Sequence, residues 1–189
     1  MTGIELLAVV LGLACVALTV RQHIACWPTG LAMVVLYIAI FYRAKLYSDM
    51  ILQVVYVFLQ IYGWHAWLRG GPNRTRLAVS RLSPRGAMGW AIAGFIGTVA
   101  LGSTMSRYTD ASLPFVDAFA TVASLIAQWL MGRKVLESWL VWIVVDIVSI
   151  GMYVSKRLNL TAGLYVVFLV LAVQGYLAWR RTPRGPATA

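Results

Sequence analysis

Seven apolar runs, each long enough or nearly long enough to cross a lipid bilayer, constrain this chain more than any other feature. The hydrocarbon core of a bilayer is about 30 Å thick, so a spanning helix needs about 20 predominantly apolar residues. Composition agrees, because 61% of the 189 residues are hydrophobic and only 12% are charged. The sequence therefore predicts an all-α integral membrane protein with seven transmembrane helices. We expect them at 4–20, 27–42, 49–68, 86–104, 113–131, 138–153 and 161–179.

The formal net charge of +10 comes from basic residues in the gaps between these runs. No basic stripe interleaved with aromatic residues is present, so membrane topology explains the charge better than nucleic-acid binding. Eleven Lys and Arg residues lie on one side of the predicted membrane and five on the other. By the positive-inside rule, we expect the N-terminus outside and the C-terminus in the cytoplasm.

The first three runs resemble the last three in an ungapped register of 112 positions. One run lies between the halves, so the repeats are parallel and the architecture is 3+1+3, a known transporter plan. We place repeat one at about 3–69, the linker and fourth helix at about 70–112, repeat two at about 113–181 and a disordered tail at 182–189. Matches beyond apolar character are Arg21 with Arg133, Trp27 with Trp139, Gly63 with Gly175, Trp67 with Trp179 and Arg69 with Arg181.

Asp146 lies at the midpoint of the sixth predicted span. A carboxylate at that depth costs about 2.5–3.5 kcal/mol on insertion scales, so it requires a partner inside the protein. At helical spacing, Trp139, Trp142, Asp146, Ser149 and Tyr153 follow one another along a single face. This stripe predicts the wall of a pocket.

Polar residues also form stripes on two other predicted spans. The third span carries Gln53, Tyr56, Gln60 and Trp64, and the fifth carries Asp117, Thr121, Ser124 and Gln128. Hydrogen-bonding groups that face lipid are costly, so these side chains should face protein or a water-filled path. The alternative is that they only join helices to one another.

Comparison of the repeats favours a binding role for these polar groups. Val34 occupies the repeat position of Asp146, and Ala172 occupies that of Gln60. The scaffold is duplicated, but its polar groups are not. An asymmetric small molecule bound between the halves explains this difference better than helix packing does.

Several residues at the ends of the predicted spans have ordinary structural explanations. Asp49 and Asp117 lie at span starts, where a helix N-terminus favours an anion, so we assign them to capping. An interfacial aromatic belt accounts at least as well as a pocket does for Trp27, Trp67, Trp129 and Trp179.

The sequence lacks the usual motifs of catalysis and metal binding. It has no nucleotide-binding loop and no hydrolase signature, and Cys15 and Cys26 lack metal-ligand spacing. We therefore expect no catalytic residue, no metal and no cofactor. A carboxylate flanked by two indoles suits a flat aromatic cation. Two alternatives are that Asp146 exchanges a proton to couple transport, or that it stays protonated and donates a hydrogen bond.

The assembled motifs resemble the PnuC family of vitamin transporters, of the nicotinamide riboside type, over about residues 20–180. The first half contributes Trp27-Pro-x-Gly, Leu46-Tyr-x-Asp-x-x-Leu-Gln53, Tyr56 and Gly63-Trp-x-x-Trp67. The second half contributes Asp117-Ala, Glu137-x-Trp-x-x-Trp142, Leu164-Tyr165 and Gly175-x-x-x-Trp179.

This resemblance implies a SWEET-like fold in the bacterial inner membrane, a homotrimer, and facilitated diffusion with cytoplasmic phosphorylation as the trap. It also implies that substrate binds Trp139, Trp142, Asp146, Gln53 and Tyr165, with Tyr56 and Trp64 nearby. Asp146 stands where nicotinamide riboside members typically carry Asn, and the family includes thiamine transporters. Nicotinamide riboside is the favoured cargo and thiamine the alternative. A membrane assembly protein that transports nothing is the competing function.

Overall fold

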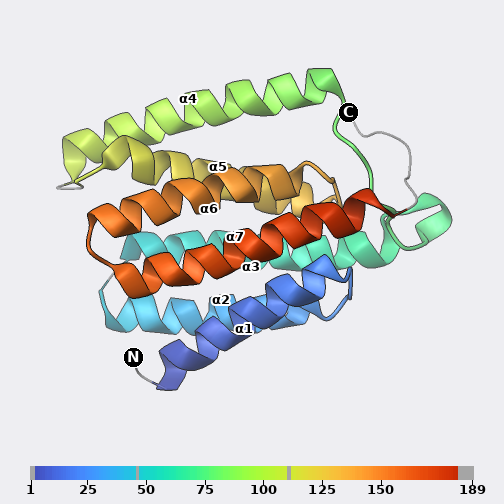
Figure 1. Cartoon of the computed structure of the whole chain (residues 1–189), viewed down its shortest axis with the longest axis horizontal. Helices are drawn as coiled ribbons and strands as arrows, with labels where there is room; N and C mark the ends of the chain where they lie inside the picture. Colours follow the sequence, from blue (N-terminus) through green and yellow to red (C-terminus); the bar gives the residue numbers. More distant parts are fainter. Residues whose placement is uncertain (1–2, 46, 110–111, 183–189) are drawn as a thin grey trace. The chain divides into compact units, whose positions relative to one another are not determined.

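The computed structural model describes residues 3–45, 47–109 and 112–182, and these residues form seven α-helices of membrane-spanning length (Figure 1). The predicted all-α, seven-helix fold is confirmed. The predicted tail lies outside the described residues, apart from Thr182. The helices are α1 (Gly3–Val20), α2 (Cys26–Arg43), α3 (Tyr47–Arg69), α4 (Pro84–Tyr108), α5 (Pro114–Gly132), α6 (Ser138–Ser155) and α7 (Asn159–Arg180), and η1 (Pro72–Arg74) is a short 3₁₀ turn.

Local chemistry sets the N-terminal end of α4. Ser83 is its N-cap, with a hydroxyl that accepts a hydrogen bond from the Gly86 amide at 3.0 Å. Pro84 follows at the first helical position, where a missing N–H costs nothing. The helix continues to Tyr108, beyond the apolar run that predicted it. The hydroxyl of Thr104 donates to the Ala100 carbonyl, so a polar residue is accommodated inside the helix.

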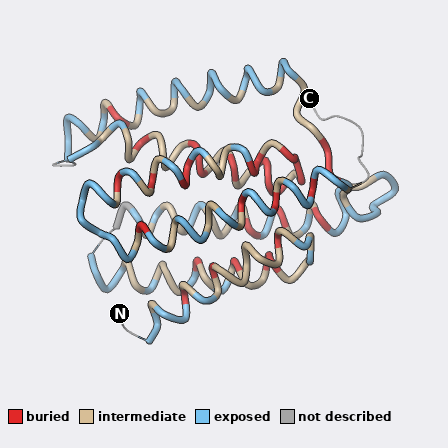
Figure 2. The backbone as a smooth tube through the Cα atoms, in the orientation of Figure 1, coloured by how far each residue is buried: buried red, intermediate tan, exposed pale blue. Residues whose placement is uncertain are grey.

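The chain divides into two compact units. The first holds α1–α3 together with residues 132–134, and the second holds α4–α7. Within the first unit α2 packs along both α1 and α3, and within the second α6 packs along α7. Figure 2 shows α4 exposed along most of its length, which suits a helix that faces lipid.

The turns between helices repeat at the register predicted from the sequence. Gln22 and Lys134 lie 112 positions apart and have φ angles of 53° and 56°. Lys45 and Arg157 have the same spacing, with φ angles of 59° and 58°. Left-handed backbone is uncommon for residues other than glycine, so its recurrence at matched positions supports an ancestral duplication.

A glycine and two tryptophans fasten α2 to α3 in the first unit. The ring of Trp27 lies directly against Gly63, in the space that a side chain at that position would fill. Trp67 meets Trp27 edge to face, with ring centroids 5.3 Å apart and an interplanar angle of 83°. Only glycine leaves room for this approach. We call the arrangement a tryptophan joint.

The second unit contains the same joint between α6 and α7. Trp139 lies against Gly175 and meets Trp179 at 5.5 Å with an interplanar angle of 90°. These rings and those of Trp27 and Trp67 are buried. The interfacial belt is therefore the wrong explanation for Trp27, Trp67 and Trp179, which pack inside their units.

Candidate substrate-binding site

The centre of the candidate site in the second unit is the predicted stripe on α6. Asp146 is 3% exposed and Ser149 is also buried, whereas Trp142 is half-buried. Among the described residues of this unit, none forms a hydrogen bond or ion pair with the Asp146 carboxylate. The structure thus brings a buried acidic group and a nearby indole together on one helix face.

Trp139 lies at one end of the same stripe, where it packs against α7. Its indole N–H is buried and has no hydrogen-bond acceptor among the described residues, and the same holds for Trp27. Because both repeats share this feature, the unpaired N–H belongs to the tryptophan joint. Packing alone therefore accounts for the position of Trp139.

The other end of the stripe also meets α7. The rings of Tyr153 and Tyr165 are 5.2 Å apart and tilted by 39°. Phe168 meets Tyr165 edge to face, with centroids 5.9 Å apart and an interplanar angle of 86°. We call Tyr153, Tyr165 and Phe168 the aromatic cluster. Phe168 was missed in the sequence, although it follows Tyr165 by three positions and so shares its helix face.

In the first unit, the candidate residues share one face of α3. Gln53, Tyr56 and Trp64 are half-buried, whereas Gln60 is buried. The amide of Gln60 lies against Gly30 of α2, in space that any larger side chain there would fill. Gln60 thus packs within its own unit.

Large and small residues are exchanged between the repeats at the positions of Gly30 and Gln60. Trp142 occupies the repeat position of Gly30, and Ala172 occupies that of Gln60. In the first unit the large side chain of the pair, Gln60, comes from α3. In the second it comes from α6. The two copies of the scaffold therefore present different surfaces.

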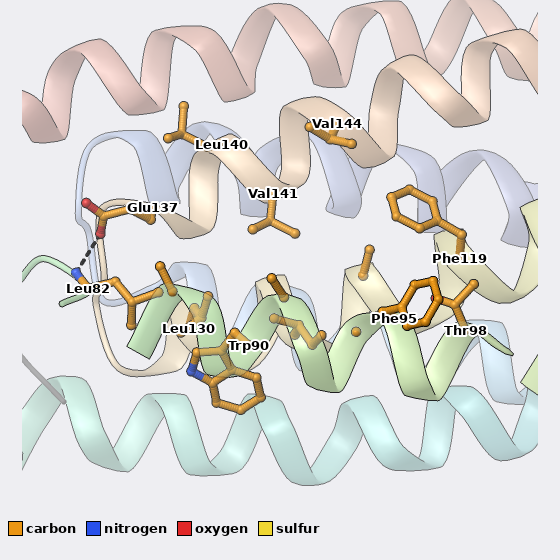
Figure 3. Close-up of a pocket in the computed structure, with 15 residues that line it drawn as sticks. Leu82, Trp90, Phe95, Thr98, Phe119, Leu130, Glu137, Leu140, Val141 and Val144 are labelled. Carbon is orange, nitrogen blue, oxygen red and sulfur yellow. Dashed lines mark hydrogen bonds between the residues drawn. The ribbon is translucent and has the colours of Figure 1, made fainter. Parts of the chain in front are cut away.

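The second unit also contains a cavity of about 520 Å³ between α4, α5 and α6 (Figure 3). Figure 3 shows Phe95, Thr98 and Phe119 at one end and Leu82 and Glu137 at the other. Its walls are almost wholly apolar and include none of the predicted site residues, Gln128 of α5 among them. A lining of this kind suits hydrocarbon rather than a charged vitamin.

Glu137 connects the start of α6 to the linker. Its carboxylate accepts a hydrogen bond from the Leu82 amide at 2.8 Å, and the Leu136 amide donates to the Ser80 carbonyl at 2.9 Å. Ser80 also forms an isolated parallel bridge with Val135. The linker therefore fixes the first turn of the helix that carries Asp146. Sequence reasoning missed this contact, which joins residues 55 positions apart.

Lys134 is a second missed residue, and it belongs to the first unit. It is 8% exposed, its Nζ donates to the Leu77 carbonyl at 3.0 Å, and it lies 4.6 Å from the ring centroid of Trp67. Burial lowers the pKa of Lys134, an effect that Cys26 opposes and Arg76 reinforces. The cation–π contact with Trp67 offsets part of the cost of desolvation.

Comparison with known proteins identifies the family. A family model described as nicotinamide mononucleotide transporter matches residues 2–181. The chain belongs to this family. A structural relative, the crystal structure of the vitamin B3 transporter PnuC, has a TM-score of 0.73 and 29% identity, covering 93% of this chain and 79% of that one.

Individual relatives agree. The nicotinamide riboside transporter PnuC of Escherichia coli is 26% identical, covering 97% of this chain and 87% of the relative. PnuC of Neisseria mucosa is 31% identical, covering 92% of this chain and 70% of the relative. The riboflavin/roseoflavin transporter RibM of Streptomyces davaonensis is 27% identical, covering 90% and 81%. The chain is therefore a multi-pass membrane protein of a vitamin-transporter family, and it is not an enzyme.

Proposed function

We propose that this protein takes up nicotinamide riboside by facilitated diffusion and that phosphorylation in the cytoplasm traps the transported vitamin. The observation that carries the proposal is Asp146, a buried carboxylate at mid-span that has no hydrogen-bond or ion-pair partner among the described residues of its own unit. The pyridinium ring of nicotinamide riboside is a permanent aromatic cation. It supplies the missing counter-charge and a flat face for Trp142.

We assign substrate contacts within each repeat by itself. Asp146 holds the cationic ring and Trp142 stacks on it, whereas Trp139 and Ser149 complete the α6 wall and Tyr165 contributes from α7. From the other polar stripes we assign substrate contacts to Gln53, Tyr56, Gln60, Trp64 and Gln128.

The charge of Asp146 also discriminates among vitamins. The flavin ring of riboflavin is neutral, so it does not offset a buried carboxylate, although RibM is a relative of this chain. Thiamine is an aromatic cation and satisfies the same requirement, and it remains the alternative cargo. A proton-coupled carrier would use Asp146 as the proton site instead.

Uptake into proteoliposomes tests the proposal. Labelled nicotinamide riboside, thiamine and riboflavin are offered separately to vesicles that contain the purified protein. We expect saturable uptake of nicotinamide riboside that an imposed proton gradient does not change. Saturable uptake of none of the three would overturn the proposal in favour of an assembly protein, and gradient-driven accumulation would identify a coupled carrier.

We further propose an outside N-terminus, a cytoplasmic C-terminus and a homotrimer. The asymmetry of eleven against five basic residues supports the topology. The family resemblance is the support for the trimer. Mass measurement of the protein in detergent distinguishes a trimer from other states.

A further inference from the structure

The apolar cavity of the second unit runs lengthwise along α4 (Figure 3). It begins beside Leu82 in the linker, and its lining on α4 extends from Ala87 to Thr98. These positions of α4 span about 16 Å, at about 1.5 Å of rise per residue. Half of the hydrocarbon core of a bilayer is about 15 Å thick. The cavity therefore has the length of one leaflet, measured from the linker end of α4.

Short side chains create this space. The lining includes four alanine or glycine positions, Ala87, Ala91, Gly94 and Ala123. A Cβ at Gly97 would lie only 3.1 Å from the Val122 side chain, so α4 and α5 are in close contact next to the cavity. The cavity is thus open because its own lining is small, and not because the two helices are far apart.

The mouth of the cavity faces away from the helices of the unit. Phe95, Leu140 and Val144 line the cavity and are exposed. At the depth of these residues, the solvent of a membrane protein is hydrocarbon. An acyl chain can therefore enter the cavity from the side, directly from the bilayer.

The linker end of the cavity is basic. Arg81 directly precedes Leu82. Among the described residues, no carboxylate pairs with Arg81 and no acceptor binds its Nε. Arg85 is exposed in the first turn of α4, where the helix dipole also favours an anion. Glu137 lies at this end too, but its carboxylate already accepts a hydrogen bond from the Leu82 amide. An anionic headgroup supplies Arg81 with a counter-charge and with hydrogen-bond acceptors.

We propose that this cavity binds an anionic phospholipid of the leaflet on the linker side. One acyl chain fills the space between α4, α5 and α6, and the phosphate lies at Arg81 and Arg85. The volume of about 520 Å³ is within the usual range of small-molecule sites. An apolar length of one leaflet and a basic end at the membrane surface match the two parts of a phospholipid, in the order in which a bilayer presents them. The assignment does not depend on the identity of the cargo.

Photocrosslinking locates the acyl chain. The purified protein is reconstituted in phosphatidylcholine vesicles that contain a small fraction of phosphatidylglycerol with a diazirine on one acyl chain. We expect crosslinks at the cavity lining of α4, α5 and α6 that unlabelled phosphatidylglycerol competes away. Crosslinks spread evenly over exposed apolar residues elsewhere, such as Phe58 of α3, would overturn the proposal.

Ala91→Phe fills the cavity and tests the site by a second route. We expect the phosphatidylglycerol that the protein retains in detergent, counted by native mass spectrometry, to fall about ten-fold. This is the effect of excluding about two methylene groups from an apolar site. Ala93→Phe is the matched control, because Ala93 is exposed on the same helix and does not line the cavity.

Two outcomes of this comparison would contradict the proposal. One is equal retention of lipid in Ala91→Phe and Ala93→Phe, with both proteins at the thermal midpoint of the wild type. The other is a change of oligomeric mass in Ala91→Phe while the retained lipid stays the same. That result would assign the cavity to a contact between copies of the chain.

Arg81→Gln tests the headgroup without changing the cavity. The preference of the protein for phosphatidylglycerol over phosphatidylcholine should fall about five-fold, the usual effect of one basic residue at an anionic membrane surface. Arg107→Gln is the matched control, because Arg107 lies in the last turn of α4, at its opposite end. It should leave the preference unchanged. Equal retention of the two lipids by the wild type would overturn the proposal.

Discussion

Asp146 combines a structural cost with a proposed function. A buried carboxylate without a partner destabilises a membrane protein, and its retention is explained when a ligand supplies the opposite charge. Removal of the charge should therefore separate stability from transport. Neutral substitutions at this position relieve the cost of burial and remove the counter-charge for the cargo.

For Asp146→Leu we expect nicotinamide riboside to bind about ten- to a hundred-fold more weakly, the range for loss of a charged hydrogen-bonding partner. For Asp146→Ala we expect uptake to be abolished. The thermal midpoint of both proteins in detergent should equal or exceed that of the wild type. A lower midpoint with normal uptake would show that Asp146 only supports the fold.

Lys134 provides a second test at the level of one side chain. Its pKa is lowered from its ordinary value of 10.5, mainly by burial. Between the lowered value and 10.5 the unfolded chain binds more protons than the folded protein, so stability rises with pH through this window. We expect the wild type to gain stability relative to Lys134→Met as the pH is raised from neutral toward 10.5.

Lys45 is the control for this experiment, because it has the same left-handed backbone but is exposed. Thermal midpoints of the wild type and both variants are measured across the same pH range. A constant difference between the wild type and Lys134→Met would contradict the lowered pKa.

At the scale of helices, the tryptophan joints explain how each unit holds one helix pair together, α2 with α3 and α6 with α7. A Cβ at Gly175 would lie 2.5 Å from the Trp139 ring, closer than real contacts allow. The ring is wedged between two helices and Trp179, so it has little room to move. The same geometry applies to Gly63 and Trp27.

We expect Gly63→Ala and Gly175→Ala each to destabilise the protein by about 1–3 kcal/mol, the usual cost of overpacking. Gly151→Ala in α6 and Gly163→Ala in α7 are the controls, because nothing lies within 4 Å of a Cβ at either position. These controls should be neutral or slightly stabilising, since alanine favours helix over glycine. Thermal unfolding in detergent compares the four proteins, and equal midpoints would refute the joint.

The positions of the helices were predictable, but the direction of individual side chains was not. A span is defined by the length of an apolar run, which is local information. The inward packing of Trp27 depends on Gly63, and that of Trp179 depends on Trp139, each in a neighbouring helix, which no hydropathy pattern reveals. The burial of Lys134 likewise depends on Trp67, far away in the sequence. The Asp146 stripe was predictable because helical periodicity alone assembles it.

At the scale of the whole chain, charge asymmetry across the membrane leads to a direct test of topology. Thr75 lies in the linker, which we place in the cytoplasm, and Thr109 follows α4 on the opposite side. In a chain whose Cys15 and Cys26 are replaced by Ala, a membrane-impermeant maleimide should label Thr109→Cys in intact cells. Thr75→Cys should react only after the cells are broken. The reverse pattern would invert the proposed topology.

The exchange of Gly30 and Gln60 for Trp142 and Ala172 also bears on assembly. Duplicated halves can mispair, because helices of one copy resemble their counterparts in the other. A tryptophan in place of Gly30 would collide with Gln60, so α6 cannot substitute for α2 beside α3. In the converse error, α2 beside α7 would leave a void between Gly30 and Ala172. The differences between Gly30 and Trp142 and between Gln60 and Ala172 therefore favour pairing of α2 with α3 and of α6 with α7 as the chain inserts into the membrane.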